Sequence, residues 1–332
     1  MWARLKSHWF LISLVLVFVI GFFASEALTP LLEMTTLRSA IVFAVMGSMG
    51  ITLPAHSVRQ SLRKPLPTLL AIAINIVVVP MMCWPMRAYL PAPIFGGLFV
   101  ASLVPCTLAS AAVWTRKAGG NESIALMTTV VTNLACIAVV PIGVALVLAK
   151  TTELSVTDQV WNLTLVVVIP IVLTQTMRMA GLAEWADRQK FRLSFLAQLG
   201  ILSMVGFGSI ASAMVVREAM QENASLFGLQ IGQLFVSVAM LHVAALVFGV
   251  FAARVVRADR ESQIAVGIAG SQKTLTIGLQ IAIDCGVSVI PMLMYHFTQL
   301  VIDTMIASHW TNASKSKTNS NEETSASLRK GV

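Results

Sequence analysis

The chain of 332 residues is 57% hydrophobic and only 11% charged. Long apolar stretches separated by short charged loops are typical of a polytopic helical membrane protein and exclude a soluble globular one. A net charge of +8 would suggest nucleic acid as the partner of a soluble chain. Here it reflects lysine and arginine collected in loops beside the lipid bilayer, so we expect no nucleic-acid partner.

Windows of apolar residues predict ten membrane-spanning helices. They cover residues 9–25, 36–53, 66–86, 93–114, 122–149, 157–177, 191–215, 228–253, 263–283 and 287–308. The first could instead be a signal peptide, because Arg4 and Lys6 precede a short apolar stretch that ends in small residues at 24–27. A retained span is favoured because it completes the symmetry of the two halves. The tail, residues 311–332, has little apolar content and is expected to be a disordered cytoplasmic segment.

Lysine and arginine are distributed unevenly between alternate loops. With the N-terminus inside the cell, eighteen of the 23 basic residues fall in cytoplasmic segments, and Lys273 alone lies within a span. The remaining four are on the outer side: Arg38, Arg87, Lys150 and Arg217. By the positive-inside rule, both termini are cytoplasmic. The sequence therefore predicts an integral multi-pass protein of the cell (inner) membrane.

The ten predicted spans divide into two halves of five, residues 1–150 and 151–310. Because five is odd, the second half is inserted upside down relative to the first. This is the inverted-repeat architecture of secondary transporters. The sequence therefore predicts an all-α membrane protein made of two inverted five-helix repeats.

A charge lies near the middle of the ninth span. Lys273 follows Gly270-Ser271-Gln272, and a lysine at mid-membrane costs roughly 2.5–3.5 kcal/mol on insertion scales. The fourth span has a matching interruption at Leu103-Val104-Pro105-Cys106-Thr107-Leu108-Ala109-Ser110, where proline removes a helix hydrogen bond. Paired interruptions in corresponding spans of two halves indicate a binding site.

The spans that follow each interruption carry polar residues on one helical face. In the fifth span these are Thr128, Thr129, Thr132 and Asn133, and in the tenth they are His296, Gln299 and Asp303. Helix packing and back-bonding to carbonyls would also explain the threonines. A carboxylate within the membrane needs a partner, and Lys273 is the expected counter-ion of Asp303. His242, alone in an apolar span, is interpreted as a packing residue.

Three motifs in order then give a family resemblance. Lys117-Ala118-Gly119-Gly120-Asn121-Glu122 looks like a glycine-rich element of the SBF-like branch of the bile acid:sodium symporter superfamily. The stretch from Ser271 to Gly278 is similar to that branch's S-x-x-K-S/T-L-T-x-G element, and Tyr295-His296 with Gln299 fits its Y-H-x-x-Q element. The resemblance covers about residues 1–310. It implies ten helices of which the fourth and ninth are broken and cross, and sodium-coupled uptake of organic anions such as bile acids.

The resemblance also implies a set of sodium ligands. Ser110, Thr129 and Gln272 carry over as metal ligands, and Asn75 stands where the family has a glutamine in the third helix. Three other ligand positions fall on Ala111, Ala125 and Ile268, which have no side-chain oxygen. The candidate substrate- or ion-binding residues are Asn75, Ser110, Asn121, Thr128, Thr129, Thr132, Asn133, Gln272, Lys273, Thr274, His296, Gln299 and Asp303. Na⁺ is the one candidate cofactor, with an incomplete set of ligands.

These observations predict a secondary transporter of a small organic anion that works by alternating access. Two alternatives stay open. Transport could be independent of sodium, either proton-coupled or uncoupled, with Lys273 in place of the cation. The protein could also transport nothing and regulate ion homeostasis. An intramembrane enzyme is disfavoured, because the chain has no paired carboxylates, no H-E-x-x-H motif and no nucleophile elbow.

Overall fold

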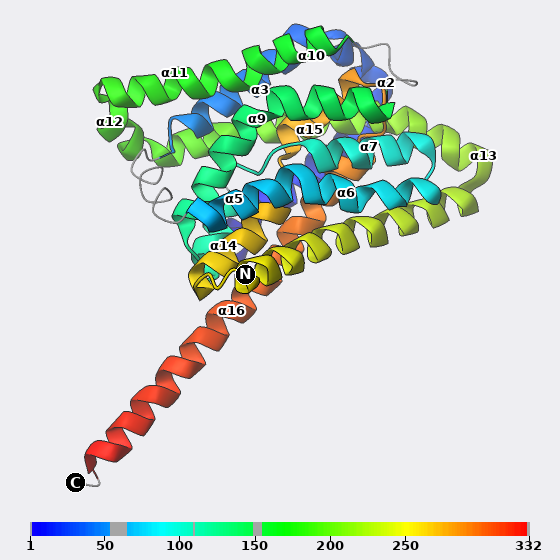
Figure 1. Ribbon diagram of the computed structural model, residues 1–332. Helices are drawn as coiled ribbons and strands as arrows, with labels where there is room; N and C mark the ends of the chain where they lie inside the picture. The colour runs from blue at the N-terminus through cyan, green and yellow to red at the C-terminus, as the bar shows by residue number, and fades with distance from the viewer. Residues whose placement is uncertain (1, 54–64, 109, 149–154, 331–332) are drawn as a thin grey trace.

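The computed structural model describes residues 2–53, 65–108, 110–148 and 155–330. Every regular element among them is helical. Figure 1 shows the helices gathered in one bundle, from which the end of the last helix projects. An all-helical structure is expected in lipid, where each backbone polar group must find a partner within the protein. Ala109, in the first interruption, and the loop residues Arg59, Arg63, Lys64 and Lys150 lie outside the described residues.

The α-helices follow one another along the whole described chain. They are α1 (Trp2–Phe23), α2 (Ser25–Leu28), α3 (Thr35–Gly50), α5 (Pro65–Ala73), α6 (Val79–Cys83), α7 (Ala92–Leu103), α8 (Ser110–Lys117), α9 (Glu122–Leu148), α10 (Val156–Leu163), α11 (Ile169–Met177), α12 (Ala183–Arg188), α13 (Lys190–Val255), α14 (Arg260–Ser271), α15 (Leu275–Asp284) and α16 (Ile290–Lys330). Short 3-10 turns occur at η1 (Thr29–Glu33) and η3 (Trp84–Ala88), and π-helical turns at η2 (Ile74–Val78), η4 (Thr164–Val168) and η5 (Arg178–Leu182).

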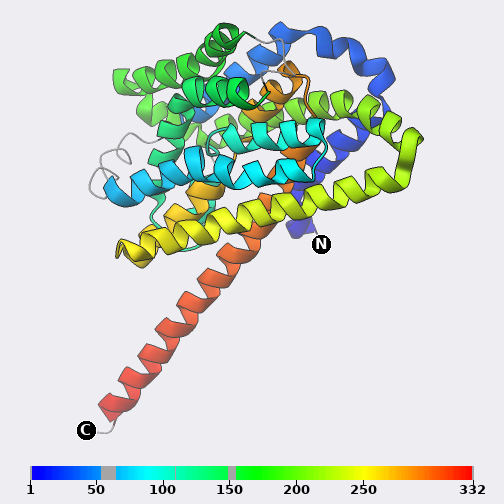
Figure 2. The same cartoon turned by 45° about the vertical axis from the view of Figure 1, so that its right-hand side comes forward.

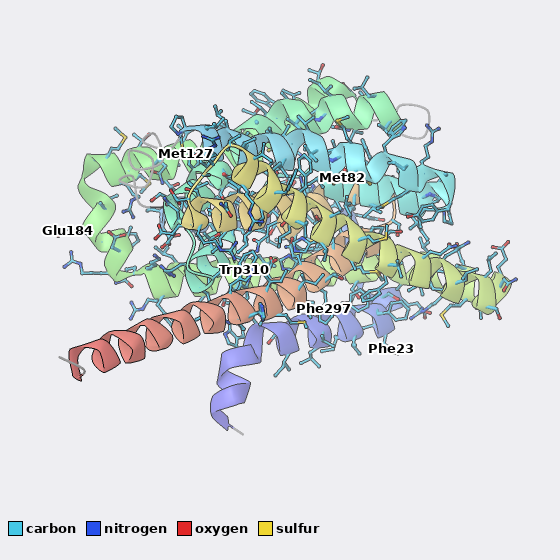
Figure 3. The ribbon with its side chains drawn as sticks, turned by 60° about the horizontal axis from the view of Figure 1, so that its bottom comes forward. Phe23, Met82, Met127, Glu184, Phe297 and Trp310 are labelled. Carbon is cyan, nitrogen blue, oxygen red and sulfur yellow. The ribbon has the colours of Figure 1, made fainter. Side chains whose placement is uncertain are left out.

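Several helical runs are long and apolar enough to cross a membrane. Among the described residues there are five: Pro65–Ala88, Glu122–Val147, Thr157–Arg188, Lys190–Ala213 and Val215–Val255. A bent pair, Ile12–Phe23 and Ser25–Glu33, would make a sixth. Figure 3 shows Phe23 and Phe297 at the surface, where 75% and 43% of each residue is exposed, as suits contact with lipid. The chain is therefore a multi-pass membrane protein, and a ten-span arrangement stays a prediction.

Both predicted interruptions are present. The fourth predicted span is divided into α7 and α8, and the ninth into α14 and α15. Each part is too short to cross a bilayer alone. Thr274 N donates to Pro105 O at 2.9 Å, so the two interruptions are in direct contact.

Two segments differ from the sequence prediction. The seventh and eighth spans form one helical run, α13, interrupted only at Asn223, whose Oδ1 accepts from Leu226 N at 2.9 Å and begins the second arm. Figure 2 shows the bend between the two arms. Residues 311–330, expected to be disordered, continue α16 as helix to Lys330. Figure 1 shows this end leaving the bundle.

The second arm of α13 packs closely against α14. A Cβ on Gly249 would lie 2.9 Å from the Cα of Gly267, so neither position has room for a side chain. Such close approach of two backbones through small residues is common between membrane helices. It fixes α14 against α13 and so determines where the second interruption lies.

Candidate functional site

The end of α14 is stabilised by side chains from other helices. A helix end leaves its last carbonyls without main-chain donors, which is costly in lipid. Asn75 Nδ2 donates to the carbonyls of Ala269, Gly270 and Gln272 at 3.3, 3.2 and 2.9 Å. The carbonyl of Ser271 accepts from the hydroxyl of Tyr295 at 2.9 Å. One asparagine and one tyrosine therefore donate to the broken end, and His242 Nδ1 lies 3.4 Å from the same Ser271 carbonyl.

Gln299 binds both main-chain groups of the lysine at the interruption. Its Oε1 accepts from Lys273 N, and its Nε2 donates to Lys273 O, each at 2.9 Å. This two-point contact resembles the pairing of β-strands and holds Lys273 in an extended conformation between α14 and α15. It explains why a glutamine follows three residues after the tyrosine-histidine pair on α16.

The first interruption is satisfied in the same way. Pro105 has no N–H, and the chain between α7 and α8 exposes successive carbonyls. Val104 O accepts from Lys273 Nζ at 3.0 Å, and Pro105 O from Thr274 N at 2.9 Å. The carbonyls of Cys106 and Thr107 accept from residues of α9, namely Asn133 Nδ2 and Thr129 Oγ1, each at 3.0 Å. Two of these four donors, Lys273 Nζ and Thr274 N, belong to the second interruption.

The polar face of α9 therefore has mostly a structural part in this arrangement. Besides Thr129 and Asn133, Thr132 accepts from the main-chain N–H of Cys106 at 3.1 Å. Thr128 donates back to Ile124 O within its own helix, at 2.9 Å, and does not reach the interruption. Asn121 lies apart, in the turn before α9, where its N–H donates to Glu261 O at 3.0 Å. The structure thus brings Thr129, Thr132 and Asn133 to the first interruption, but neither Thr128, the fourth stripe residue, nor Asn121.

The ammonium group of Lys273 is fully buried and has three oxygen acceptors. They are Asn75 O at 2.6 Å, Asn75 Oδ1 at 3.3 Å and Val104 O at 3.0 Å. The local sequence explains why Asn75 O is available. Val79 N donates to Ile74 O in the π-helical turn, and the next residue, Pro80, has no N–H. Lys273 therefore uses each of its three donors and links the third predicted span to both interruptions.

The expected ion pair between Lys273 and Asp303 is wrong. Among the described residues Asp303 instead contacts His242 Nε2 at 2.9 Å and Gln272 Nε2 at 2.5 Å. The Lys273 side chain extends toward Asn75 and Val104. Residue spacing along a helix does not determine in which direction a side chain points. His242 is the residue that the sequence reading missed. A lone histidine in an apolar span gave no signal of its partner 61 residues away.

The oxygens expected to bind sodium are engaged with one another. Gln272 Oε1 accepts from the hydroxyls of Thr107 and Ser110 at 2.8 and 2.9 Å. The apolar replacements pack into two buried clusters, Ala111 and Ala125 with Cys106 and Ala269, and Ile268 with Ala118, Ile264 and Ala307. A hard cation needs several converging oxygens, and here carbon and sulfur occupy part of that volume. The residues present do not fit a sodium ion.

A cavity of about 260 Å³ opens beside the two interruptions. Its polar lining includes Thr107 and Ser110 from the first interruption and Thr274 from the second. Its apolar wall comes from α1, α3, α8, α13, α15 and α16: Phe10, Met49, Val113, Trp114, Ala197, Ile201, Leu275 and Leu300. Lys273 does not line it. The cavity therefore meets helix ends and hydroxyls, and no lysine, arginine, aspartate or glutamate among the described residues lines it.

His296 also lines this cavity, and its neighbours determine its tautomer. Gln299 Nε2 lies 3.1 Å from His296 Nδ1, and the contacts with Lys273 fix Gln299 so that this nitrogen is a donor. Nδ1 must then accept, which places the ring proton on Nε2. His296 is 7% exposed and lines the cavity, so its Nε2–H remains as a hydrogen-bond donor that Gln299 does not use.

Comparisons with known proteins find relatives that are named as transporters. The chain is 26% identical over 243 residues to a probable chloroplastic sodium/metabolite cotransporter, BASS4, of Arabidopsis thaliana, covering 68% of this chain and 54% of the plant protein. It is 25% identical over 320 residues to the uncharacterized sodium-dependent transporter YocS of Bacillus subtilis, covering 95% and 94%. It is 26% identical over 195 residues to sodium/bile acid cotransporter 7-B of Xenopus laevis, covering 56% and 57%.

The chain thus spans about half the length of the plant relatives, but nearly all of the Bacillus protein. A family model matches residues 8–312, which include both interruptions and every contact described above. The protein belongs to the SBF-like CPA transporter family.

Proposed function

We propose that this protein is a secondary transporter of a small organic anion, that it works by alternating access in the cell (inner) membrane, and that it does not need sodium. The proposal includes ten spans in two inverted repeats, cytoplasmic termini and no catalytic activity. The observation that carries it is the cavity between the two interrupted helices. A transported solute needs a site at mid-membrane that moving helix groups can expose to either side.

The cavity supports an anionic solute although no lysine or arginine within the described ranges lines it. The first residues of α8 and α15, Ser110 and Leu275, both line it, and helix N-termini attract negative charge. Thr274, the residue before α15, makes no side-chain capping hydrogen bond to that N-terminus. His296 adds an N–H donor. Several donors and an apolar wall suit a carboxylate or sulfonate attached to a hydrophobic body.

Lys273 supports independence from sodium. Its ammonium contacts two main-chain carbonyls and one side-chain amide oxygen, the kind of ligand that sodium would require. A fixed cation at this position holds the two interruptions together without an ion that must bind and leave. The relatives' names favour the alternative, since two of those described above are called sodium cotransporters and one a sodium-dependent transporter.

Flux measurements separate these possibilities. Purified protein in proteoliposomes would be given radiolabelled cholate, benzoate or pyruvate, with choline chloride replacing sodium chloride outside. We expect uptake of at least one anion at an unchanged rate in choline. Uptake that requires sodium would contradict the role given to Lys273. Absence of flux for every anion, together with no anion-induced thermal stabilisation, would favour the regulator of ion homeostasis.

A further inference from the structure

An interhelical ion pair lies at the end of α15 away from the cavity. Arg38 Nη2 lies 3.1 Å from Asp284 Oδ1. The arginine side chain is 4% exposed and the aspartate side chain 25% exposed. Asp284 is also held by Gln280, whose Nε2 donates to Oδ2 at 2.8 Å. This pair joins α3 to the end of α15.

The position of the pair relative to the cavity is fixed by the two helices that carry it. α3 contacts the cavity near its end through Met49, followed by Thr52 just beyond the helix, and it carries Arg38 near its start. α15 contacts the cavity at its start, through Leu275, and ends at Asp284. Nine residues of α-helix span roughly 14 Å. The charge count places Arg38 on the outer side, so the cavity lies toward the cytoplasm and the pair toward the outside.

We propose that Arg38 and Asp284 form the outer gate of the transport pathway, which is closed in this structure and must open to expose the cavity to the other side. The proposal rests on alternating access, which requires one end to be shut while the other is open. α15 carries the second interruption to the cavity, and α3 belongs to the helices that face it. An ion pair across this boundary closes the outer end and breaks when the two groups of helices separate.

The surroundings of the pair are suited to opening. Nε and Nη1 of Arg38 have no hydrogen-bond partner among the described residues, and neither have Oε1 of Gln280 and Oε1 of Gln159. A small cavity of about 20 Å³, lined by Gln159, Asn162, Gln280 and Asp284 among others, adjoins the pair. Buried polar groups that lack partners favour contact with water. Separation of α3 from α15 would hydrate all of them at once.

A native cysteine next to the gate provides the test. Cys285 follows Asp284 and is 6% exposed, whereas Cys83, Cys106 and Cys136 are exposed by 1% or less. A membrane-impermeant maleimide applied from outside should label Cys285 slowly in the unmodified protein. We expect Arg38→Gln to increase the labelling rate by about tenfold, because an open form that is otherwise populated at about 0.1–10% becomes more frequent.

This direction cannot come from thiol chemistry alone. Removing a nearby cation disfavours a thiolate and would by itself slow the reaction, so faster labelling reports opening. The exchanged pair, Arg38→Asp with Asp284→Arg, should return the rate toward that of the unmodified protein. The matched control is Glu26→Gln, which breaks an exposed ion pair with Arg217, a residue also assigned to the outer side. It should leave the rate unchanged, and Cys285→Ser should abolish labelling.

The labelling assay needs no substrate, so its result is independent of whether any anion is transported. Equal labelling of Arg38→Gln and unmodified protein would overturn the gate. Faster labelling that includes Cys106 would overturn it too, because it would show general loosening of the bundle. A rate that rises in Arg38→Gln and falls in the exchanged pair would establish the gate even if no tested anion showed flux.

Discussion

Two buried cations in this protein have opposite surroundings. Lys273, fully buried, places its three ammonium donors on three oxygens from two neighbouring segments. Arg38, buried to a similar degree, uses one nitrogen in an ion pair and leaves two without partners among the described residues. A saturated cation fixes the elements that it joins, whereas an unsaturated one gains partners when water enters. The comparison suggests that the interruptions stay together during transport while the outer end separates.

The strongest way to test this difference is to remove the saturated cation. Lys273→Met would leave Asn75 O and Val104 O buried without a donor, and we expect the free energy of unfolding to fall by about 3–5 kcal/mol. Denaturant titration in mixed micelles would measure it. Lys117→Met is the control, because that lysine is exposed and lies over the ring of Trp114. A loss no larger than in this control would contradict the structural role of Lys273.

The next largest effect is expected at the asparagine that serves both the lysine and the end of α14. Asn75→Leu removes a donor to three carbonyls and one acceptor of the ammonium. We expect a loss of about 2–4 kcal/mol in the same titration, since several buried acceptors lose their donor together. Asn75→Asp should not restore stability, because its carboxylate cannot donate to carbonyls. Full rescue by aspartate would show that charge, and not donation, matters here.

A double-mutant cycle should separate the two candidate partners of Asp303. His242→Leu and Asp303→Asn remove the two sides of a 2.9 Å contact and should show a coupling energy of about 1–3 kcal/mol. The parallel cycle with Lys273→Met and Asp303→Asn should be close to additive, because those side chains contact different groups. Strong coupling in the second cycle and none in the first would mean that the contacts are assigned to the wrong residues.

The smallest effect is expected at the unsaturated cation. Arg38→Lys keeps a single ion pair and removes donors that have no partner within the described residues, so stability should change by less than about 1 kcal/mol. The converse change, Lys273→Arg, should reduce stability, because a fully buried site whose donors are all used has no room for the larger guanidinium group. Thermal denaturation of the two variants side by side measures the contrast. Similar losses of stability in Arg38→Lys and Lys273→Arg would contradict the proposed difference between the two cations.

The sequence predicted more of the fold than of the contacts within the candidate site. The apolar windows coincide with helices throughout, because lipid leaves the backbone few alternatives. Pro105 and the polar run before Lys273 located both interruptions, since loss of a helix hydrogen bond is a local property of the chain. The family motifs likewise come from short stretches, and the match over residues 8–312 confirmed the resemblance.

Partners of buried polar groups were decided only by the tertiary structure. Sequence spacing predicted that Lys273 and Asp303 lie within reach of one another, but the direction of each side chain depends on which helices pack around it. The contact of Asp303 with His242 joins α16 to α13, and the contact of Lys273 with Asn75 joins the second interruption to a π-helical turn before Pro80. Residue type and spacing set which groups must find partners within the membrane. The packing of distant helices then determines which partner each group contacts, because many donors and acceptors of equal strength lie at the same depth.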